Sequence, residues 1–368
     1  MANLFKSFST WIIIGVIAAI LPLIFDSSFA LTLLSKMGVL IIFTVAYNML
    51  LGQGGMLSFG HAIYFGLAGY ASIHIMNGIG AETLPYFPTV LFPLIGAVVG
   101  LFFGCLVGYV STRRAGTAFA MISLGFGEMV TATTLIFVLF FNGEDGIQTD
   151  RMVGPEPFGI TFGPQIEIYY LILFWCVITV ALMYIITKTP FGRMSNAVRD
   201  NPERAAFIGY SVRRVRWQAF ALSSMFAGAA GSLHALNYEH IGFESVSVIQ
   251  SGAVLFMAFI GGAGHFLGPI VGAIGLTYLD STLADYTEAW LLYLGLTFSG
   301  IVMFAPGGLA GLIVMHGPIA RTDKKLLTSL VKPYLLAIGS VVTGLIGLIG
   351  IIEMLYFRSL ISKGEGEV

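Results

Sequence analysis

Long apolar runs alternate with short polar connections along almost the whole chain. A helix needs about 20 apolar residues to cross the hydrocarbon core of a bilayer. The pattern therefore predicts an all-α polytopic membrane protein, a bundle of about 9–11 transmembrane helices. The predicted spans lie near residues 11–25, 35–51, 56–76, 89–110, 117–141, 168–187, 217–237, 249–264, 269–283, 289–304 and 334–357.

Two of these segments leave the number of crossings open. The segments 249–264 and 269–283 are short, so they form either one hairpin that enters the membrane partway or two full crossings. The run 11–25 could be mistaken for a signal peptide, but it lacks a small-residue cleavage site and leads into further apolar segments. We therefore interpret it as a retained first span.

Composition agrees with a membrane protein. Of the 368 residues, 57% are apolar and 10% are charged, whereas soluble domains average about 25% charged residues. The two cysteines, Cys105 and Cys176, lie inside apolar runs, where thiols behave as small hydrophobic groups. The 18 basic and 19 acidic residues nearly cancel, and we expect no nucleic-acid partner.

Basic residues are concentrated on one side of the predicted bundle. With a cytoplasmic N-terminus, 14 of the 18 lie on inner segments, including all seven in 188–216. The inferred outer loop 142–167 is acidic, and Arg151 is its one basic residue. Because short cytoplasmic loops are enriched in Lys and Arg, this distribution predicts a cytoplasmic N-terminus and places 188–216 in the cytoplasm.

Glycines recur at a spacing suited to helix packing. Gly96, Gly100, Gly104 and Gly108 are four residues apart and therefore share one face of the predicted helix 89–110. Such small faces let the backbones of membrane helices approach closely. The stripe predicts dense packing within the bundle and gives no indication of a channel.

Three glycine-rich segments interrupt the hydrophobic pattern, at 51–62, 259–273 and 304–311. Non-helical backbone at membrane depth survives only where protein or water satisfies its polar groups, and in transporters such breaks often lie beside the substrate site. Tight turns near the inner face explain the same pattern, so both interpretations stay open. On the first, the candidate translocation-pathway residues in the breaks are Gly54, Ser58, Gly261 and Gly262.

Ionisable side chains within the predicted spans are few. His61 and Glu128 lie deepest, and because intramembrane ionisable groups often mark pathways, both are further candidates for the translocation pathway. Four others lie near predicted helix ends, where snorkelling to the interface accommodates them: Lys36, His74, His234 and Asp280.

No group of residues indicates an enzyme. The chain lacks metal-binding spacings such as His-x-x-x-His and Cys-x-x-Cys. It contains no Gly-Lys dipeptide and therefore no P-loop. We expect this chain to bind no metal and no cofactor, and to hydrolyse no ATP by itself.

The cytoplasmic stretch RDNPERAAFIG is predicted to form a short helix. Either Asp200 or Asn201 can cap its start, and Pro202 suits the first turn. Glu203 favours the positive end of the helix dipole, and Gly209 suits a left-handed end. Because a helix of about two turns is unstable alone in water, a membrane surface or a partner must cover its apolar residues. These are Ala205, Ala206 and Ile208, with Phe207 flanking them.

Four motifs occur in order over residues 35–315. They are GQGGMLSFGHAIYFGLAGYAS (52–72), the segment from FGRMSNAVRDNPERAAFIGYSV to SLHAL (191–236), GGAGHFLGPIVGA and MFAPGGLAGL. Together they resemble the motifs of branched-chain amino acid ABC importer permeases, the LivM-like subunits. The chain departs from the family pattern at Gly54 and Gly55, where a bulkier residue is more usual, and in AGYAS, which replaces G-A-Y.

The resemblance implies a half-permease that pairs with a second, related permease subunit in the inner membrane of a bacterium or archaeon. Two cytoplasmic ATPase subunits, which bind ATP and Mg, would drive it, and an extracytoplasmic binding protein would deliver the amino acid. The coupling loop 188–216 would insert into the ATPase. Carried over residue by residue, the coupling positions are Arg199, Asp200, Asn201, Pro202, Glu203, Ala205, Ala206 and Gly209.

The resemblance also divides the chain into three parts. Residues 1–34 form an N-terminal span and outer loop, and 35–315 form the permease domain. Residues 316–368 form a basic cytoplasmic linker and an extra C-terminal transmembrane helix, to which the resemblance assigns no role.

Two alternatives concern the cargo and the driving force. Related permeases also carry urea, short amides or aromatic acids, so a same-family importer of one of these is an alternative to one for hydrophobic amino acids. An ion-coupled secondary carrier without ATPase partners is an alternative of another class. The small number of deep charged residues speaks against that carrier.

Overall fold

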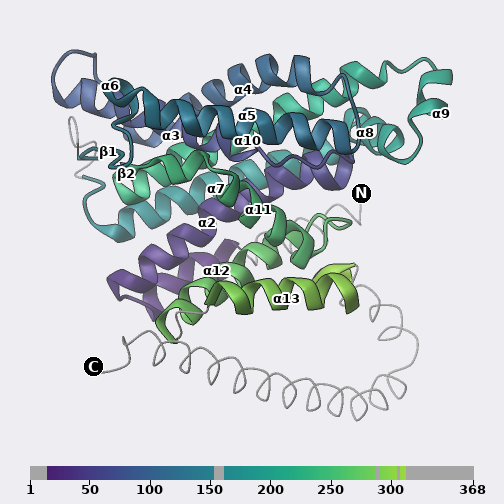
Figure 1. Ribbon diagram of the computed structural model, residues 1–368. Coiled ribbons are helices and arrows are strands. Elements are labelled where there is room, and N and C mark those ends of the chain that lie inside the picture. Colours follow the sequence, from purple (N-terminus) through teal and green to yellow (C-terminus); the bar gives the residue numbers. More distant parts are fainter. Residues whose placement is uncertain (1–14, 153–160, 287–289, 305–306, 312–368) are drawn as a thin grey trace, which may run out of the picture. The chain divides into compact units, whose positions relative to one another are not determined.

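The structure is a computed structural model that describes residues 15–152, 161–286, 290–304 and 307–311 (Figure 1). The chain divides into two compact units, 1–311 and 312–368. The second unit, with the predicted span 334–357, lies outside the described residues, and every helix and strand labelled in Figure 1 belongs to the first.

The first unit is built almost entirely of helices. The elements are a helix over Gly15–Ile24, α2 (Ser28–Asn48), the π-helical turn η1 (Met49–Gln53), α3 (Ala62–Gly80), η2 (Thr89–Leu91), α4 (Phe92–Ser111), α5 (Thr117–Ile136), α6 (Val138–Phe141), β1 (Ile147–Gln148), α7 (Gln165–Lys188), α8 (Pro190–Asp200), α9 (Pro202–Phe207), α10 (Val212–Tyr238), β2 (His240–Ile241), η4 (Phe243–Val246), α11 (Val248–Gly261), α12 (Gly268–Tyr286) and α13 (Trp290–Phe304).

Helix length and composition confirm the predicted fold class. In the described part of the chain, five helical segments are long and apolar enough to cross a membrane. The protein is therefore an all-α polytopic membrane protein. The five segments are Ser28–Gln53, Thr89–Ser111, Thr117–Ile136, Gln165–Lys188 and Val212–Tyr238.

The charged loops lie at opposite ends of the long helices. Figure 1 shows α8 and α9 at one end, and α6, β1 and β2 at the other. The first, here called the α8–α9 end, carries the basic loop 188–216. At the second, the β1–β2 end, β1 and β2 form an antiparallel pair. Arg151, shortly after β1, is buried and donates to the carbonyls of Leu236 and Asn237 at the end of α10.

The glycine stripe of α4 packs directly against α10. A Cβ atom placed on Gly96 or Gly100 would clash with the backbone of α10, at Gly228 and Ser224 respectively. Gly104 and Gly108 lie against α10 in the same way, at side chains nearer its start. The predicted close approach of helix backbones is confirmed, and α10 is the partner helix.

The first glycine-rich break is a re-entrant segment. The predicted span 56–76 is wrong in its bounds, because α3 begins only at Ala62 and runs to Gly80. Residues 54–61 instead return from η1 into the bundle as irregular backbone. Buried side chains satisfy this backbone: the Tyr47 hydroxyl pairs with both N–H and C=O of Ser58, and Ser123 Oγ accepts from Phe59 N–H.

Helix α11 also begins inside the bundle. Its first residue, Val248, lies against Gly127 in the middle of α5, and Val246 just before it lies against Gly66 of α3. With 14 residues, α11 is about 21 Å long and too short to cross a bilayer. The structure therefore excludes a full crossing by α11, while α12, with 19 residues, is about 28 Å long; the choice between a partial hairpin and two crossings is left as the sequence left it.

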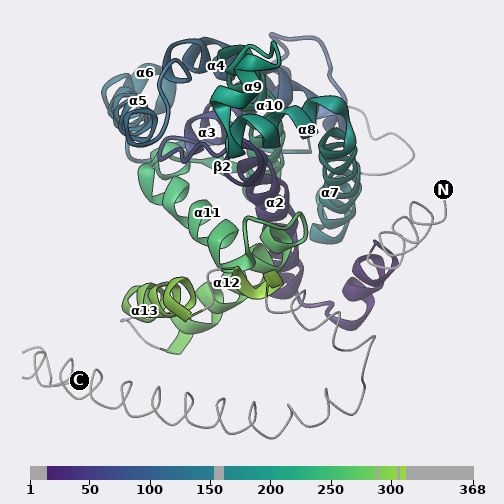
Figure 2. The same cartoon turned by 90° about the vertical axis from the view of Figure 1, so that its right-hand side faces the viewer.

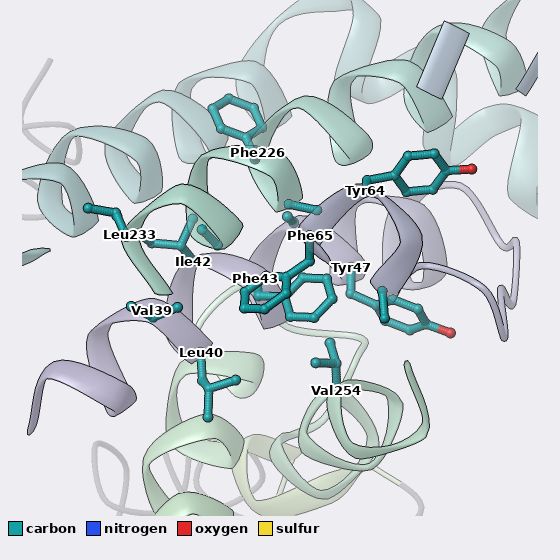
Figure 3. Packing of buried hydrophobic residues seen from close by; sticks show 14 of the residues in the cluster. Val39, Leu40, Ile42, Phe43, Tyr47, Tyr64, Phe65, Phe226, Leu233 and Val254 are labelled. Carbon is teal, nitrogen blue, oxygen red and sulfur yellow. The ribbon is translucent and has the colours of Figure 1, made fainter. Parts of the chain in front are cut away.

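Aromatic side chains fill the core between α2, α3 and α10. Figure 3 shows Phe43 and Tyr47 of α2 beside Tyr64 and Phe65 of α3. The Phe43 and Phe65 rings stack with centroids 4.6 Å apart, and all four residues are fully buried. Such rings bury a large apolar area each and favour stacked or edge-to-face contacts, so they hold the irregular segment between α2 and α3 in place.

An ion pair joins two helices where the sequence suggested only snorkelling. Lys36 Nζ of α2 lies 3.2 Å from Asp280 Oδ2 of α12. Both side chains are about one-third exposed, at 34% and 32%. Each of the two residues therefore has a partner of opposite charge across the helix interface, which the snorkelling interpretation did not include.

Candidate functional site

The basic loop forms two consecutive short helices, of which the sequence predicted one. Helix α8 begins at Pro190, and the Thr189 hydroxyl caps it by accepting from Gly192 N–H. Thr followed by Pro is a helix-start signal, so the local sequence contained the information needed to predict α8. Figure 2, which looks onto this end, shows α8 beside α7.

Helix α9 has the predicted bounds, and the structure decides which residue caps it. Asn201 Oδ1 accepts from Arg204 N–H at 2.9 Å, whereas the Asp200 carboxylate pairs with Arg199 at 2.8 Å. Pro202 occupies the first turn. Gly209 has φ +98°, which confirms the predicted left-handed end.

The apolar residues of α9 point in two directions. Ala205, which the sequence placed on the exposed face with Ala206, is instead buried against Val198 of α8 and Val215 of α10. Phe207 and Ile208 are 91% and 69% exposed. Ala205 therefore seats α9 on the bundle, and the surface left for a partner consists of Ala206, Phe207 and Ile208, here called the α9 apolar surface.

Helix α8 is tied to the first glycine-rich break. The Arg199 guanidinium donates to the Gly52 carbonyl, and Ser195 Oγ donates to the Gln53 carbonyl at 3.4 Å. The side chain of Arg199 also passes next to Gly55. The α8–α9 pair is thus in contact with the end of η1 as well as with α7 and α10, a link that the sequence did not reveal.

His61 lies at the inner end of the same break, fully buried where α3 begins. Ser223 Oγ donates its one proton to the Ala46 carbonyl at 2.6 Å. The 2.9 Å contact between Ser223 Oγ and His61 Nε2 therefore requires His61 Nε2 to donate. Rings of Phe43 and Tyr47 pack around the imidazole, with centroids 6.1 and 5.4 Å away.

The candidate pathway residues do not form one site. Ser58 and His61 belong to the irregular segment inside the bundle. Gly54 ends η1, and the three glycine-rich breaks meet close to it. Glu128 lies on the exposed side of α5, away from the core. At the junction of the breaks, a Cβ on Gly52 would clash with Ala263, one on Gly261 with Gly268, and one on Gly262 with Gly307.

Replacing His61 by alanine is expected to lower the free energy of unfolding by about 2–4 kcal/mol, because it leaves a cavity among packed rings. The midpoint of thermal unfolding in detergent measures this. Leu139→Ala, which truncates a fully exposed side chain, is the matched control and should leave the midpoint unchanged. Equal midpoints for the two variants would contradict the packing role of His61.

Comparison with known proteins identifies the family. A family model described as branched-chain amino acid transport system / permease component matches residues 29–307. The chain belongs to this family. The match begins one residue after the start of α2 and ends among the glycines that follow α13, and it confirms the resemblance that the four motifs indicated.

Curated relatives agree with the family assignment. The chain is 27% identical over 309 residues to LivM of Escherichia coli (strain K12), a high-affinity branched-chain amino acid transport system permease protein, covering 78% of this chain and 69% of that protein. It is 29% identical over 206 residues to LsrC of Klebsiella pneumoniae, an autoinducer 2 import system permease protein, covering 53% and 55%. No solved structure matches the chain.

Proposed function

We propose that this chain is the permease subunit of an ATP-driven ABC importer of branched-chain or other hydrophobic amino acids. The observation that carries the proposal is the α8–α9 pair. A capped helix is seated on the bundle by Ala205 and presents the α9 apolar surface to solvent. An exposed apolar surface of this kind marks an interaction site, and membership of a permease family makes an ATPase the fitting partner.

The same proposal includes the remaining subunits. A second, related permease completes the pathway, two ATPases bind ATP and Mg below the α8–α9 end, and an extracytoplasmic binding protein delivers the cargo to the β1–β2 end. The basic residues of 188–216 support a cytoplasmic location for the α8–α9 end in an inner membrane. With that orientation, the N-terminus is cytoplasmic and the basic side chains lie near lipid phosphates.

The contacts of α8 provide a route by which movement of the ATPases would reach the translocation pathway. Closure of the ATPases would push α9, and α8 would carry that displacement to α7, to α10 and, through Arg199, to the carbonyl of Gly52. The break that begins there contains the pathway candidates Gly54, Ser58 and His61 and meets Gly261 and Gly262. Such a push can shift the balance between inward- and outward-facing states only if these contacts differ between the two states.

Uptake by a reconstituted transporter tests the proposal. We expect proteoliposomes that contain this chain, its second permease and both ATPases to take up L-leucine when ATP and the loaded binding protein are supplied. Vesicles without the ATPases should show background uptake under a proton or sodium gradient. Gradient-driven uptake by the permeases alone would establish the secondary carrier instead, and uptake of urea, a short amide or an aromatic acid but not leucine would correct the cargo.

A further inference from the structure

Glu128 displays a carboxylate at the middle of a membrane-spanning helix. It is the twelfth residue of the 20 in α5, about 17 Å along a helix of about 30 Å. Its side chain is exposed on the surface of this chain, and within the described residues it has no ion pair or hydrogen bond. Facing lipid at this depth would be costly for a charged group, so another group must accompany it.

The face of α5 that carries Glu128 differs from the exposed face of α4, whose side chains suit contact with lipid. On α4 the exposed positions Leu94, Val98, Phe102 and Leu106 are all bulky and apolar, and Tyr109 and Val110 follow them at the end of the helix. On α5 the exposed positions at helical spacing include small residues around the carboxylate. Small and charged side chains suit contact with protein or water rather than with acyl chains. The exposed face of α5 consists of Thr117, Ala118, Met121, Gly125, Glu128, Met129, Ala132 and Ile136.

The irregular segment 54–61 lies at the same depth, behind this face. Gly127, next to Glu128 in sequence, lies against Gly60 of the irregular segment and against the first residue of α11. Two buried atoms of that segment, Ser58 Oγ and His61 Nδ1, have no hydrogen-bond partner among the described residues. Substrate sites of transporters lie near the midplane, beside helices that begin within the membrane, as α3 and α11 do in this bundle.

From this geometry we propose that the exposed face of α5 lines the translocation pathway opposite the second permease subunit, and that Glu128 binds the ammonium group of the amino acid as it crosses. The inference rests on the proposed function, because it requires a cargo with a cationic amine. A carboxylate is complementary in charge to an ammonium group and forms the stronger, charge-assisted hydrogen bonds with it. At the midplane such a contact replaces part of the hydration that the ammonium group has left behind.

Uptake by variants of the complete transporter tests the role of Glu128. We expect Glu128→Gln to lower the maximal rate of L-leucine uptake by about 10- to 100-fold, the usual effect of losing one charge-assisted hydrogen bond. Glu128→Asp should retain most of the rate. Glu82→Gln removes an exposed carboxylate from the turn after α3 and should match the wild type.

The outcomes separate this inference from the proposed function. Leucine uptake by the wild type with an equal rate for Glu128→Gln overturns the inference alone. Failure of the wild type to take up any amino acid overturns both. Dissociation of the two permease subunits in Glu128→Gln, seen by size-exclusion chromatography, would show instead that Glu128 pairs with a basic residue of the other subunit.

Cysteine labelling tests the location of Glu128 without relying on uptake rates. In a chain with Cys105→Ser and Cys176→Ala, we expect Glu128→Cys to react with a cationic, membrane-impermeant methanethiosulfonate and L-leucine to slow the reaction. Phe102→Cys, on the bulky face of α4, should resist the same reagent. Resistance at both positions, or labelling at position 128 that leucine does not slow, would overturn the inference.

Discussion

Replacing Glu203 by lysine and Ala206 by aspartate in one chain is expected to reduce ATP-driven uptake to background while the protein remains in the membrane. Glu203 lies in the first turn of α9, where a negative charge is favoured by the helix dipole and a lysine is not. Aspartate at position 206 places a carboxylate on the α9 apolar surface, where a docked partner would bury it without a counter-charge. Uptake by proteoliposomes and quantitative immunoblots of membranes measure the two quantities.

A control variant distinguishes disruption of docking at the α9 apolar surface from a general effect of charge reversal. Glu82→Lys makes the same charge reversal as Glu203→Lys at an exposed turn after α3, far along the chain from α9, and should leave uptake unchanged. ATPase subunits should copurify with Glu82→Lys and not with the double variant. Normal uptake by the double variant would rule out α9 as the coupling element.

Replacing Gly100 by leucine is expected to lower the free energy of unfolding by about 3 kcal/mol or more, a large fraction of the about 5–15 kcal/mol by which native proteins are stable. Even a Cβ atom at this position would clash with the Ser224 carbonyl and lie close to the backbone of Gly228. Backbone atoms cannot change rotamer to relieve the clash, so α4 and α10 must separate over their whole contact. Fluorescence-detected size-exclusion chromatography after heating measures the loss.

The matched control for this variant makes the same substitution where there is room for it. A Cβ on Gly275 of α12 would have no neighbouring atom within 4 Å, and Gly275→Leu should retain the wild-type melting midpoint. If Gly100→Leu melted at the same temperature as Gly275→Leu, the close contact between α4 and α10 would not contribute to stability.

Features that depend on neighbours along the chain were predicted well. The apolar runs led to the membrane helices, and the spacing of Gly96, Gly100, Gly104 and Gly108 identified a packing face. Caps and turn residues gave the bounds of α9, because a helix end depends on side chains within a few positions of it. Helix α8 was missed although its start carries the same kind of signal at Thr189 and Pro190.

Features that depend on contacts between distant segments were not predicted. The sequence marked a glycine-rich break at 51–62 but did not indicate that the side chains of Tyr47 and Ser123 satisfy the polar groups of its backbone. The ion pair between Lys36 and Asp280 joins residues 244 positions apart. Nothing in either local sequence indicates that the other charge lies within reach.

In the candidate sites, too, some features depend on neighbours along the chain and others on contacts between distant segments. The amino-acid sequence was enough to establish a polytopic membrane protein, a basic loop and a short capped helix within that loop, since hydrophobic period, charge and capping act over short stretches of chain. The inward position of Ala205, the bond from Arg199 to the end of η1, and the placement of His61 inside the bundle and Glu128 on its surface came from the tertiary structure alone. Those outcomes depend on which helices pack against one another, and packing is a property of the whole chain.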